Sequence, residues 1–417
     1  MKDEPIIAIL DDRKDILQKW TADLANLGVA EKGFRLLSVD DKVDFQEAIV
    51  QLENRRAAIR AGEKLDPVIG EAEFDQFDVL IIDYDLLEMR ERAFFTGEDV
   101  AYLARCFSRC GIILALNQFG KNSFDLTLKG HLESFADLNI GADQLANPNL
   151  WGLPGTGFRP WIWPVIPDFL NRLDRRIRDA LEHLDDPILP FLNFEPEDID
   201  TLPREMVASL QLLPDENGTS SKSPREITFR DLVRHSPLGL TARDEPVDDE
   251  QMAHIAAARL SKWLERAVLP SQEILVDAPH LVWRFPSVCI GDASNINDLN
   301  KSASRELKET GLDLDKLSDF LFKQSHWLNR PAWWWRRIQD SQTIDEIRDP
   351  WSVERPDAVF CEDVSEFLPK GGARDFVADV PTAAPQRWVV DTATEQGSAF
   401  TDDIKGVAYM PSIQFTL

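Results

Sequence analysis

The chain has 417 residues, of which 43% are hydrophobic, and a formal net charge of −27. A surface this acidic repels phosphate backbones, which disfavours general binding to nucleic acid. The sequence has no apolar stretch of the roughly 18 residues that cross a membrane, and its acidic N-terminus is unlike a secretory signal. We therefore expect a cytoplasmic protein that binds neither nucleic acid nor membranes.

The first part of the chain alternates strand patterns with helix patterns. Short apolar runs rich in β-branched residues are typical of buried parallel strands, and apolar residues three or four apart indicate helices. Strands separated by helices imply parallel pairing through right-handed crossovers. Strands are expected at 6–10, 34–39, 79–83 and 112–116, and helices at 13–27, at 43–62 and from 97. The fifth strand has two candidates, 136–140 and the weaker 143–146.

Carboxylates gather where two of these strands end. Asp11 and Asp12 follow the first apolar run, and Asp83 and Asp85 follow the run at 79–82. In open α/β sheets, ligands bind outside the carboxyl ends of the strands. Carboxylates that converge at this edge make a site for a hard divalent cation such as Mg²⁺.

The order of parts in residues 5–118 resembles a receiver domain of two-component signalling proteins. The matching pieces are the acidic pair Asp11-Asp12, Asp83 at the end of the third strand, and Gly97 at the start of the next helix. The resemblance implies an α/β fold with a doubly wound, five-stranded parallel sheet of order 2-1-3-4-5. In that order, strands 1 and 3 are neighbours, which brings the three aspartates together.

The resemblance also implies a chemistry for this edge of the sheet. Asp83 would accept a phosphoryl group, Asp11 and Asp12 would hold Mg²⁺, and Asp85 would offer its backbone carbonyl to the metal. A histidine kinase or a phosphotransfer protein would be the partner. Phosphorylation of Asp83 would then control the C-terminal part of the chain.

Besides Leu87, which stands where receivers usually have a Pro, the chain departs from the receiver pattern at two positions that would contact the phosphoryl group. Receivers carry Ser or Thr at the end of strand 4, where this chain has Leu116 and Asn117, and Lys-Pro after strand 5, where it has Asn147-Pro148. Asn117 can donate a hydrogen bond, whereas Leu116 cannot. These departures leave open a pseudo-receiver that acts as a protein-interaction module without phosphorylation.

Two further interpretations use the same aspartates. Asp is a favoured N-cap, so these residues could simply begin helices. The sequence Asp83-Tyr84-Asp85 also resembles the Asp-x-Asp signature of haloacid-dehalogenase-type phosphatases, which would make Asp83 the nucleophile and Asp85 the acid/base. That signature normally lies on the first strand and precedes a Thr, where this chain has Leu87. Whether the chain is an enzyme stays open.

The remaining two thirds of the chain resemble no family that the motifs identify. We expect a receiver-like domain at 1–150, a loop and joining helix at 151–186, and a region at 187–417 that is helical and then mixed α/β. Trp333, Trp334 and Trp335 lie in a stretch expected to be mostly helical. For these side chains we favour inter-domain packing with stacked arginines over a partner interface.

Overall fold

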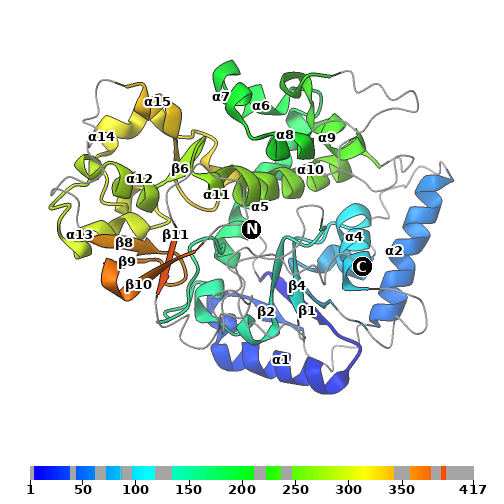
Figure 1. The fold of residues 1–417 in the computed structure, drawn as a ribbon. Helices are drawn as coiled ribbons and strands as arrows, with labels where there is room; N and C mark the ends of the chain where they lie inside the picture. Colours follow the sequence, from blue (N-terminus) through cyan, green and yellow to red (C-terminus); the bar gives the residue numbers. More distant parts are fainter. Residues whose placement is uncertain are drawn as a thin grey trace.

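The computed structural model contains a five-stranded, all-parallel sheet in the order β2-β1-β3-β4-β5 (Figure 1). This arrangement confirms the expected fold class and strand order. The strands are β1 (Ile6–Leu10), β2 (Arg35–Leu36), β3 (Val79–Asp83), β4 (Ile112–Asn117) and β5 (Leu138–Gly141). The structure describes residues 4–37, 44–61, 72–84, 86, 96–117, 134–210, 222–235, 247–341, 357–376 and 387–390.

Helices cover both faces of this sheet, which is why its strands are apolar almost throughout. Ile7 and Ile9 face α1 (Lys14–Leu27), whereas Ala8 and Leu10 face the opposite layer. We call the first cluster, which includes Ile81, Trp151 and Ile166, the α1-face core. The second, which includes Ile82, Ile49 and Val100, is the α2-face core, after α2 (Phe45–Arg60); α4 (Gly97–Phe107) lies in the same layer.

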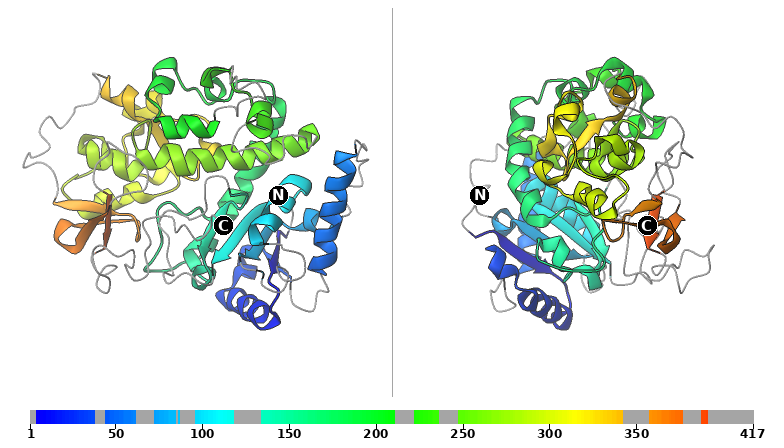
Figure 2. Two further views of the ribbon diagram at one scale, coloured as in Figure 1. Left: turned by 45° about the vertical axis from the view of Figure 1, so that its right-hand side comes forward. Right: turned by 90° about the vertical axis from the view of Figure 1, so that its left-hand side faces the viewer.

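The α2-face core continues without a break into the helical region. Met252, Leu260 and Trp263 of α10 (Asp249–Trp263) belong to the same buried cluster as Leu80. Helix α5 (Ile166–Glu182) begins in the α1-face core and packs along α10 (Figure 2). The expected boundaries near 150 and 186 stay predictions, and a shared apolar core spans both of them.

The helical region consists mainly of short helices. Helix α10 and the π-helical turn that continues it, Leu264–Val268, are its longest feature. The others are α6 (Ile188–Phe191), α7 (Pro196–Thr201), α8 (Arg204–Leu210), α9 (Phe229–His235), α11 (Leu269–Ser271), α12 (Ala278–Arg284), α13 (Ile296–Asn300), α14 (Leu314–Leu317) and α15 (Trp335–Gln339). Among the helices in the described ranges, none is both long enough and apolar enough to cross a membrane.

A small mixed sheet of order β10-β11-β8-β9 follows (Figure 1). β11 pairs parallel with β8, and the other pairs are antiparallel. This sheet confirms the mixed α/β character expected of the C-terminal region. Its strands are β8 (Ala358–Cys361), β9 (Glu366–Pro369), β10 (Ala373–Phe376) and β11 (Arg387–Val390).

Two of the three consecutive tryptophans lie on a strand and not, as expected, within a helix. Trp333 and Trp334 belong to β7 (Ala332–Trp334), which pairs with β6 (Leu275–Asp277), and Trp335 begins α15. Strand alternation sends Trp333 and Trp334 into different cores, so all three side chains are buried. Arg337 stacks 4.1 Å from the ring centre of Trp334. The packing interpretation with stacked arginine is therefore confirmed.

The first testable prediction concerns Gly97, where α4 meets the end of β3. A Cβ atom on Gly97 would lie 2.4 Å from the backbone oxygen of Asp83 and 2.8 Å from Cα of Tyr84. We expect Gly97→Ala to lower the free energy of unfolding by about 2 kcal/mol, because the backbone must shift to relieve this overlap. Urea denaturation followed by circular dichroism measures this loss.

Gly371→Ala is the matched control, because a Cβ atom there meets nothing within 4 Å. Equal stabilities of the Gly97→Ala and Gly371→Ala proteins would contradict the close packing of α4 on β3.

Candidate functional site

The strand register brings Asp11 and Asp83 to the same edge of the sheet. Leu10 pairs with Ile82, and Asp11 and Asp83 are the next residues of their chains. Adjacent strands lie about 4.8 Å apart, so the two residues are neighbours across the β1–β3 boundary. Each also continues the alternation of residues that face α1, since Ile9 and Ile81 both lie in the α1-face core.

The aspartates at this edge differ in their surroundings. Asp83 is buried, with 1% of its surface exposed, whereas Asp11 and Asp12 are half-buried. The Oδ1 atom of Asp11 accepts a hydrogen bond from the backbone N–H of Arg13 at 2.7 Å. Arg13 is the N-cap residue of α1 and makes no side-chain cap of its own. Asp11 therefore shapes the turn that precedes α1 but is not the N-cap of this helix.

The metal-binding prediction concerns Asp11, Asp12, Asp83 and Asp85. Asp85 lies outside the described residues. Within the part of the chain that the structure describes, no group of three or more His, Cys, Asp or Glu side chains is arranged to hold a metal ion. Mg²⁺ usually binds proteins through only one or two carboxylates and completes its shell with water and phosphoryl oxygens. The magnesium site therefore stays a prediction that rests on the pairing of Asp11 with Asp83.

The two positions that depart from the receiver pattern have definite places in the fold. Asn117 is the last residue of β4 and follows Leu116, the register partner of Asp83. The Leu116 side chain is buried in the α1-face core. Asn147 uses its side-chain amide within the loop after β5: Nδ2 donates to the backbone oxygen of Phe158 at 2.8 Å, and Oδ1 accepts from the N–H of Asn149. Asn147 therefore stabilises this loop.

The N-terminus of α4 rests on the end of β3 next to Asp83. The N–H of Gly97 donates to the backbone oxygen of Tyr84 at 2.9 Å, and the absence of a side chain at Gly97 makes this approach sterically allowed. Glu98, the next residue, accepts hydrogen bonds from the Ser134 hydroxyl at 2.8 Å and from the N–H of Phe135 at 2.6 Å. Helix α4 thus connects the carboxylate edge to the segment that enters β5.

Helix α10 binds the same segment, residues 134–137, from the other side. The Lys262 ammonium donates to the backbone oxygens of Ser134 and Ala136 at 2.6 and 2.8 Å. The Arg259 guanidinium also donates to Ser134. Burial holds the pKa of Lys262 well below its ordinary value, and the nearby Arg266 and Arg259 lower it further. Segment 134–137 therefore links α4, beside Asp83, to the core helix of the C-terminal region.

A second buried network, which the sequence analysis missed, lies in the C-terminal region around Asp277. One oxygen of this carboxylate accepts hydrogen bonds from Trp161 at 2.8 Å, Gln272 at 3.0 Å and Arg330 at 3.1 Å. The other oxygen lies 2.5 Å from Nδ1 of His280. Asp277 is fully buried, and these cationic and hydrogen-bonding partners hold its pKa below the ordinary range against the effect of burial.

His280 joins this network to the small mixed sheet. Its Nε2 atom lies 3.5 Å from Glu362, at the end of β8, and Glu362 pairs with Arg387 of β11. Burial alone lowers the pKa of His280, but Asp277 and Glu362 outweigh burial, so that the pKa is raised. Ion pairs among these side chains therefore connect β6 to β8 and β11. The sequence signal was weak, because only Asp277 and His280 lie at helix-start spacing and Glu362 is remote in the chain.

Together these observations define the class of the protein as an α/β protein with a doubly wound parallel sheet of order 2-1-3-4-5, a helical region and a small mixed sheet. No protein-family model, curated protein or solved structure matches the chain. The function is therefore inferred from the geometry of the site.

The second testable prediction concerns the pH dependence of stability around His280. Its pKa in the folded state is raised above the ordinary value of 6.5. The imidazolium therefore contributes its full stabilisation below that pH, and this contribution is lost as the pH rises through the folded-state pKa. We expect the free energy of unfolding to decrease as the pH rises above 6.5 and through the raised pKa of His280, as measured by urea denaturation at each pH.

His280→Gln tests the assignment of this pH dependence. It should destabilise the protein by about 3 kcal/mol at pH values where the imidazolium is charged, because it breaks a buried ion pair. It should also flatten the profile above the ordinary His pKa. His183→Gln, at an exposed histidine paired with Asp186, is the control and should leave the profile unchanged. An unchanged slope in His280→Gln would assign the pH dependence to another group.

Proposed function

We propose that the chain is a signalling protein whose N-terminal sheet acts as a receiver and accepts a phosphoryl group on Asp83. The observation that carries this proposal is the parallel register of β1 on β3, in which Leu10 pairs with Ile82 and Asp11 lies beside Asp83. The strand order 2-1-3-4-5 supports it, because β3 is the central strand and its carboxyl end is flanked by β1 and β4.

The chemical step is a transfer to a carboxylate oxygen. An oxygen of Asp83 attacks the phosphorus atom of the donor, a new P–O bond forms, and the bond to the donor's leaving group breaks with its electron pair. The product is an acyl phosphate. Mg²⁺, when bound, would neutralise negative charge at this edge, with Asp11 and Asp12 as its protein ligands. The donor would be a histidine kinase or a phosphotransfer protein.

The contacts around Asp83 support a route by which phosphorylation would change the rest of the chain. A phosphoryl group adds charge and volume where Gly97 already lies close to the backbone of Asp83. Glu98 of α4 and Lys262 of α10 bind the same segment, 134–137. A shift of α4 would therefore alter how α10 is held, as a population shift between two arrangements.

A second candidate function, a pseudo-receiver used only for protein interaction, is favoured by two residues. Leu116, which pairs with Asp83, carries no hydroxyl group, and Asn147 uses its amide in loop hydrogen bonds. In a receiver, these positions supply the hydroxyl and the cation that bind the phosphoryl oxygens. This candidate function requires the edge at Asp83 only as a docking surface.

The third testable prediction separates these two functions. The full-length protein is incubated with acetyl phosphate, with and without Mg²⁺, and its intact mass is measured. We expect one added phosphoryl group that depends on Mg²⁺ and is removed by hydroxylamine, because an acyl phosphate is labile to this nucleophile. The adduct should be absent from Asp83→Asn, a change that keeps the shape of the side chain.

Asp44→Asn is the matched control and should be labelled like the parent protein. Asp44 is the exposed N-cap of α2, and Asn caps helices as well as Asp. If the parent protein gains no phosphoryl group, the proposed phosphorylation is wrong and the pseudo-receiver is the function that remains. Labelling that persists in Asp83→Asn would place the acceptor elsewhere.

A further inference from the structure

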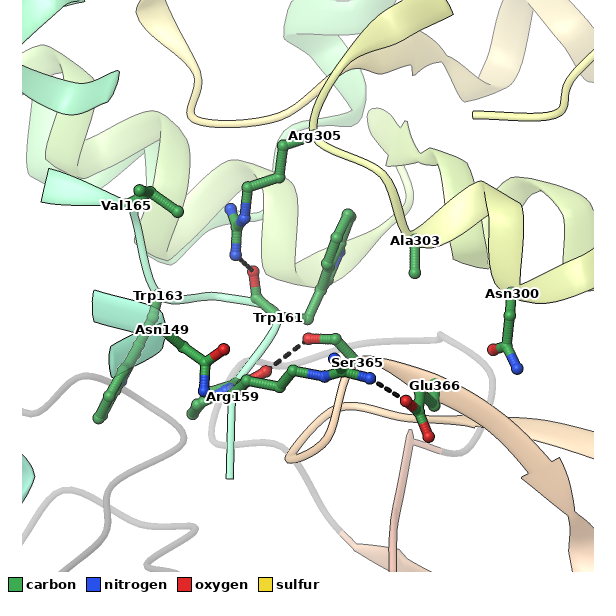
Figure 3. Close-up of a pocket in the computed structure, with 11 residues that line it drawn as sticks. Asn149, Arg159, Trp161, Trp163, Val165, Asn300, Ala303, Arg305, Ser365 and Glu366 are labelled. Carbon is green, nitrogen blue, oxygen red and sulfur yellow. Dashed lines mark hydrogen bonds and ion pairs between the residues drawn. The ribbon is translucent and has the colours of Figure 1, made fainter. Parts of the chain in front are cut away.

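A pocket of about 380 Å³ opens where three segments distant in the sequence meet (Figure 3). These are the loop that precedes α5, the turn at 300–305 and the turn between β8 and β9. The volume lies within the range of small-molecule sites and exceeds what a bare phosphate ion needs. The pocket is separate from the carboxylate edge at Asp83.

Backbone hydrogen bonds between the first and third segments build the base of this pocket. The N–H groups of Arg159 and Trp161 donate to the backbone oxygens of Asp363 and Glu362 at 2.9 and 2.8 Å. The Ser365 hydroxyl donates to the backbone oxygen of Arg159 at 2.5 Å. The indole N–H of Trp161 also donates a hydrogen bond to the Asp277 carboxylate, which fixes this side chain. The pocket is therefore largely preformed, which lowers the entropic cost of binding a ligand.

Arg305 supplies a cation that the surrounding protein only partly satisfies. Its Nη2 atom donates to the backbone oxygen of Trp161 at 2.8 Å, and its guanidinium lies 5.0 Å from the centre of that indole ring. Its Nη1 atom is buried and has no hydrogen-bond partner among the residues described, a state that it shares with Nη1 of Arg176. A buried cationic N–H without an acceptor is costly, and a bound anion would supply that acceptor.

The charge of Arg305 persists at neutral pH in spite of its surroundings. Burial and the neighbouring Arg330 lower the pKa of its guanidinium to about 9, which still leaves it mostly protonated. Arg159 lies on the opposite side of the pocket and pairs with Glu366 (Figure 3). Both side chains of that ion pair are partly exposed, at 34% and 43%, so the pair contributes little to stability. Arg159 can therefore leave Glu366 and pair with an anionic ligand.

We propose that this pocket binds a small organic anion, whose oxyanion head group pairs with Arg305 and whose body lies between Val165 and Ala303. The head group is a phosphate or a carboxylate, which present the same negatively charged oxygens to a guanidinium. The body accounts for the part of the volume that a head group alone leaves empty. The ligand would join the loop before α5 to the small mixed sheet.

The fourth testable prediction uses four probes in isothermal titration calorimetry on the full-length chain: phenyl phosphate, benzoate, inorganic phosphate and phenol. Phenyl phosphate or benzoate should bind saturably, and whichever binds more tightly identifies the head group. Inorganic phosphate should bind more weakly because it lacks a body, and phenol should not bind because it lacks a charge. Arg305→Gln should weaken binding by about tenfold or more.

Two further variants keep this test decisive. Ala303→Phe fills the pocket and leaves Arg305 in place, so it should abolish binding even if Arg305→Gln fails to fold. Arg178→Gln, at an exposed arginine of α5, should bind like the parent chain. Any of three results would overturn the proposal: phenol that binds as tightly as the anions, affinities unchanged in both pocket variants, or no binding of either aromatic anion at millimolar concentration.

Discussion

The alignment of β1 on β3 is the constraint on which the rest of the N-terminal structure depends. The carboxylate of Asp78, just before β3, accepts the N–H of Ile6 at 2.8 Å, which fixes the start of this pairing. A slip of one residue would turn Ile7 and Ile9 out of the α1-face core, because side chains alternate between the faces of a strand. It would also move Asp11 away from Asp83. The same apolar packing that stabilises the sheet therefore places the two carboxylates side by side.

This pairing has a consequence for α4 and for the helical region. α4 begins close to the backbone at the end of β3, the central strand of the sheet, and only glycine fits at position 97. Glu98 then reaches segment 134–137, which Lys262 binds from α10. The carboxylate edge and the core of the C-terminal region are thus a few hydrogen bonds apart. The close fit of Gly97 against β3 therefore connects the geometry of the carboxylate edge to the packing of α4 and α10.

Local sequence patterns predicted the parts of the structure that depend on local physics. The continuous apolar runs of β1, β3 and β4 specify buried parallel strands, and their order follows from the receiver resemblance. β2 comprises Arg35 and Leu36, which pair with β1, and positions 38 and 39 of the expected strand lie outside the described residues. Trp333 and Trp334 lie on a strand since β7 pairs with β6, a partner remote in the chain. The Asp277 network and the Arg305 pocket could not be predicted for the same reason, as tertiary contacts alone assemble them.

The strongly acidic composition explains how this chain uses its cations. With a net charge of −27, carboxylates crowd the surface, yet several cations lie in the interior. Lys262 and Arg259 donate to backbone oxygens, and Arg176 donates to the backbone oxygen of His326. Carbonyl acceptors satisfy such cations without burying a second charge, which avoids part of the desolvation cost of an ion pair. Arg305 follows the same rule for one nitrogen, through Trp161, and its Nη1 atom, like Nη1 of Arg176, has no hydrogen-bond partner among the described residues. Arg305 also lines the pocket at the loop before α5, where a bound anion would supply an acceptor for its guanidinium.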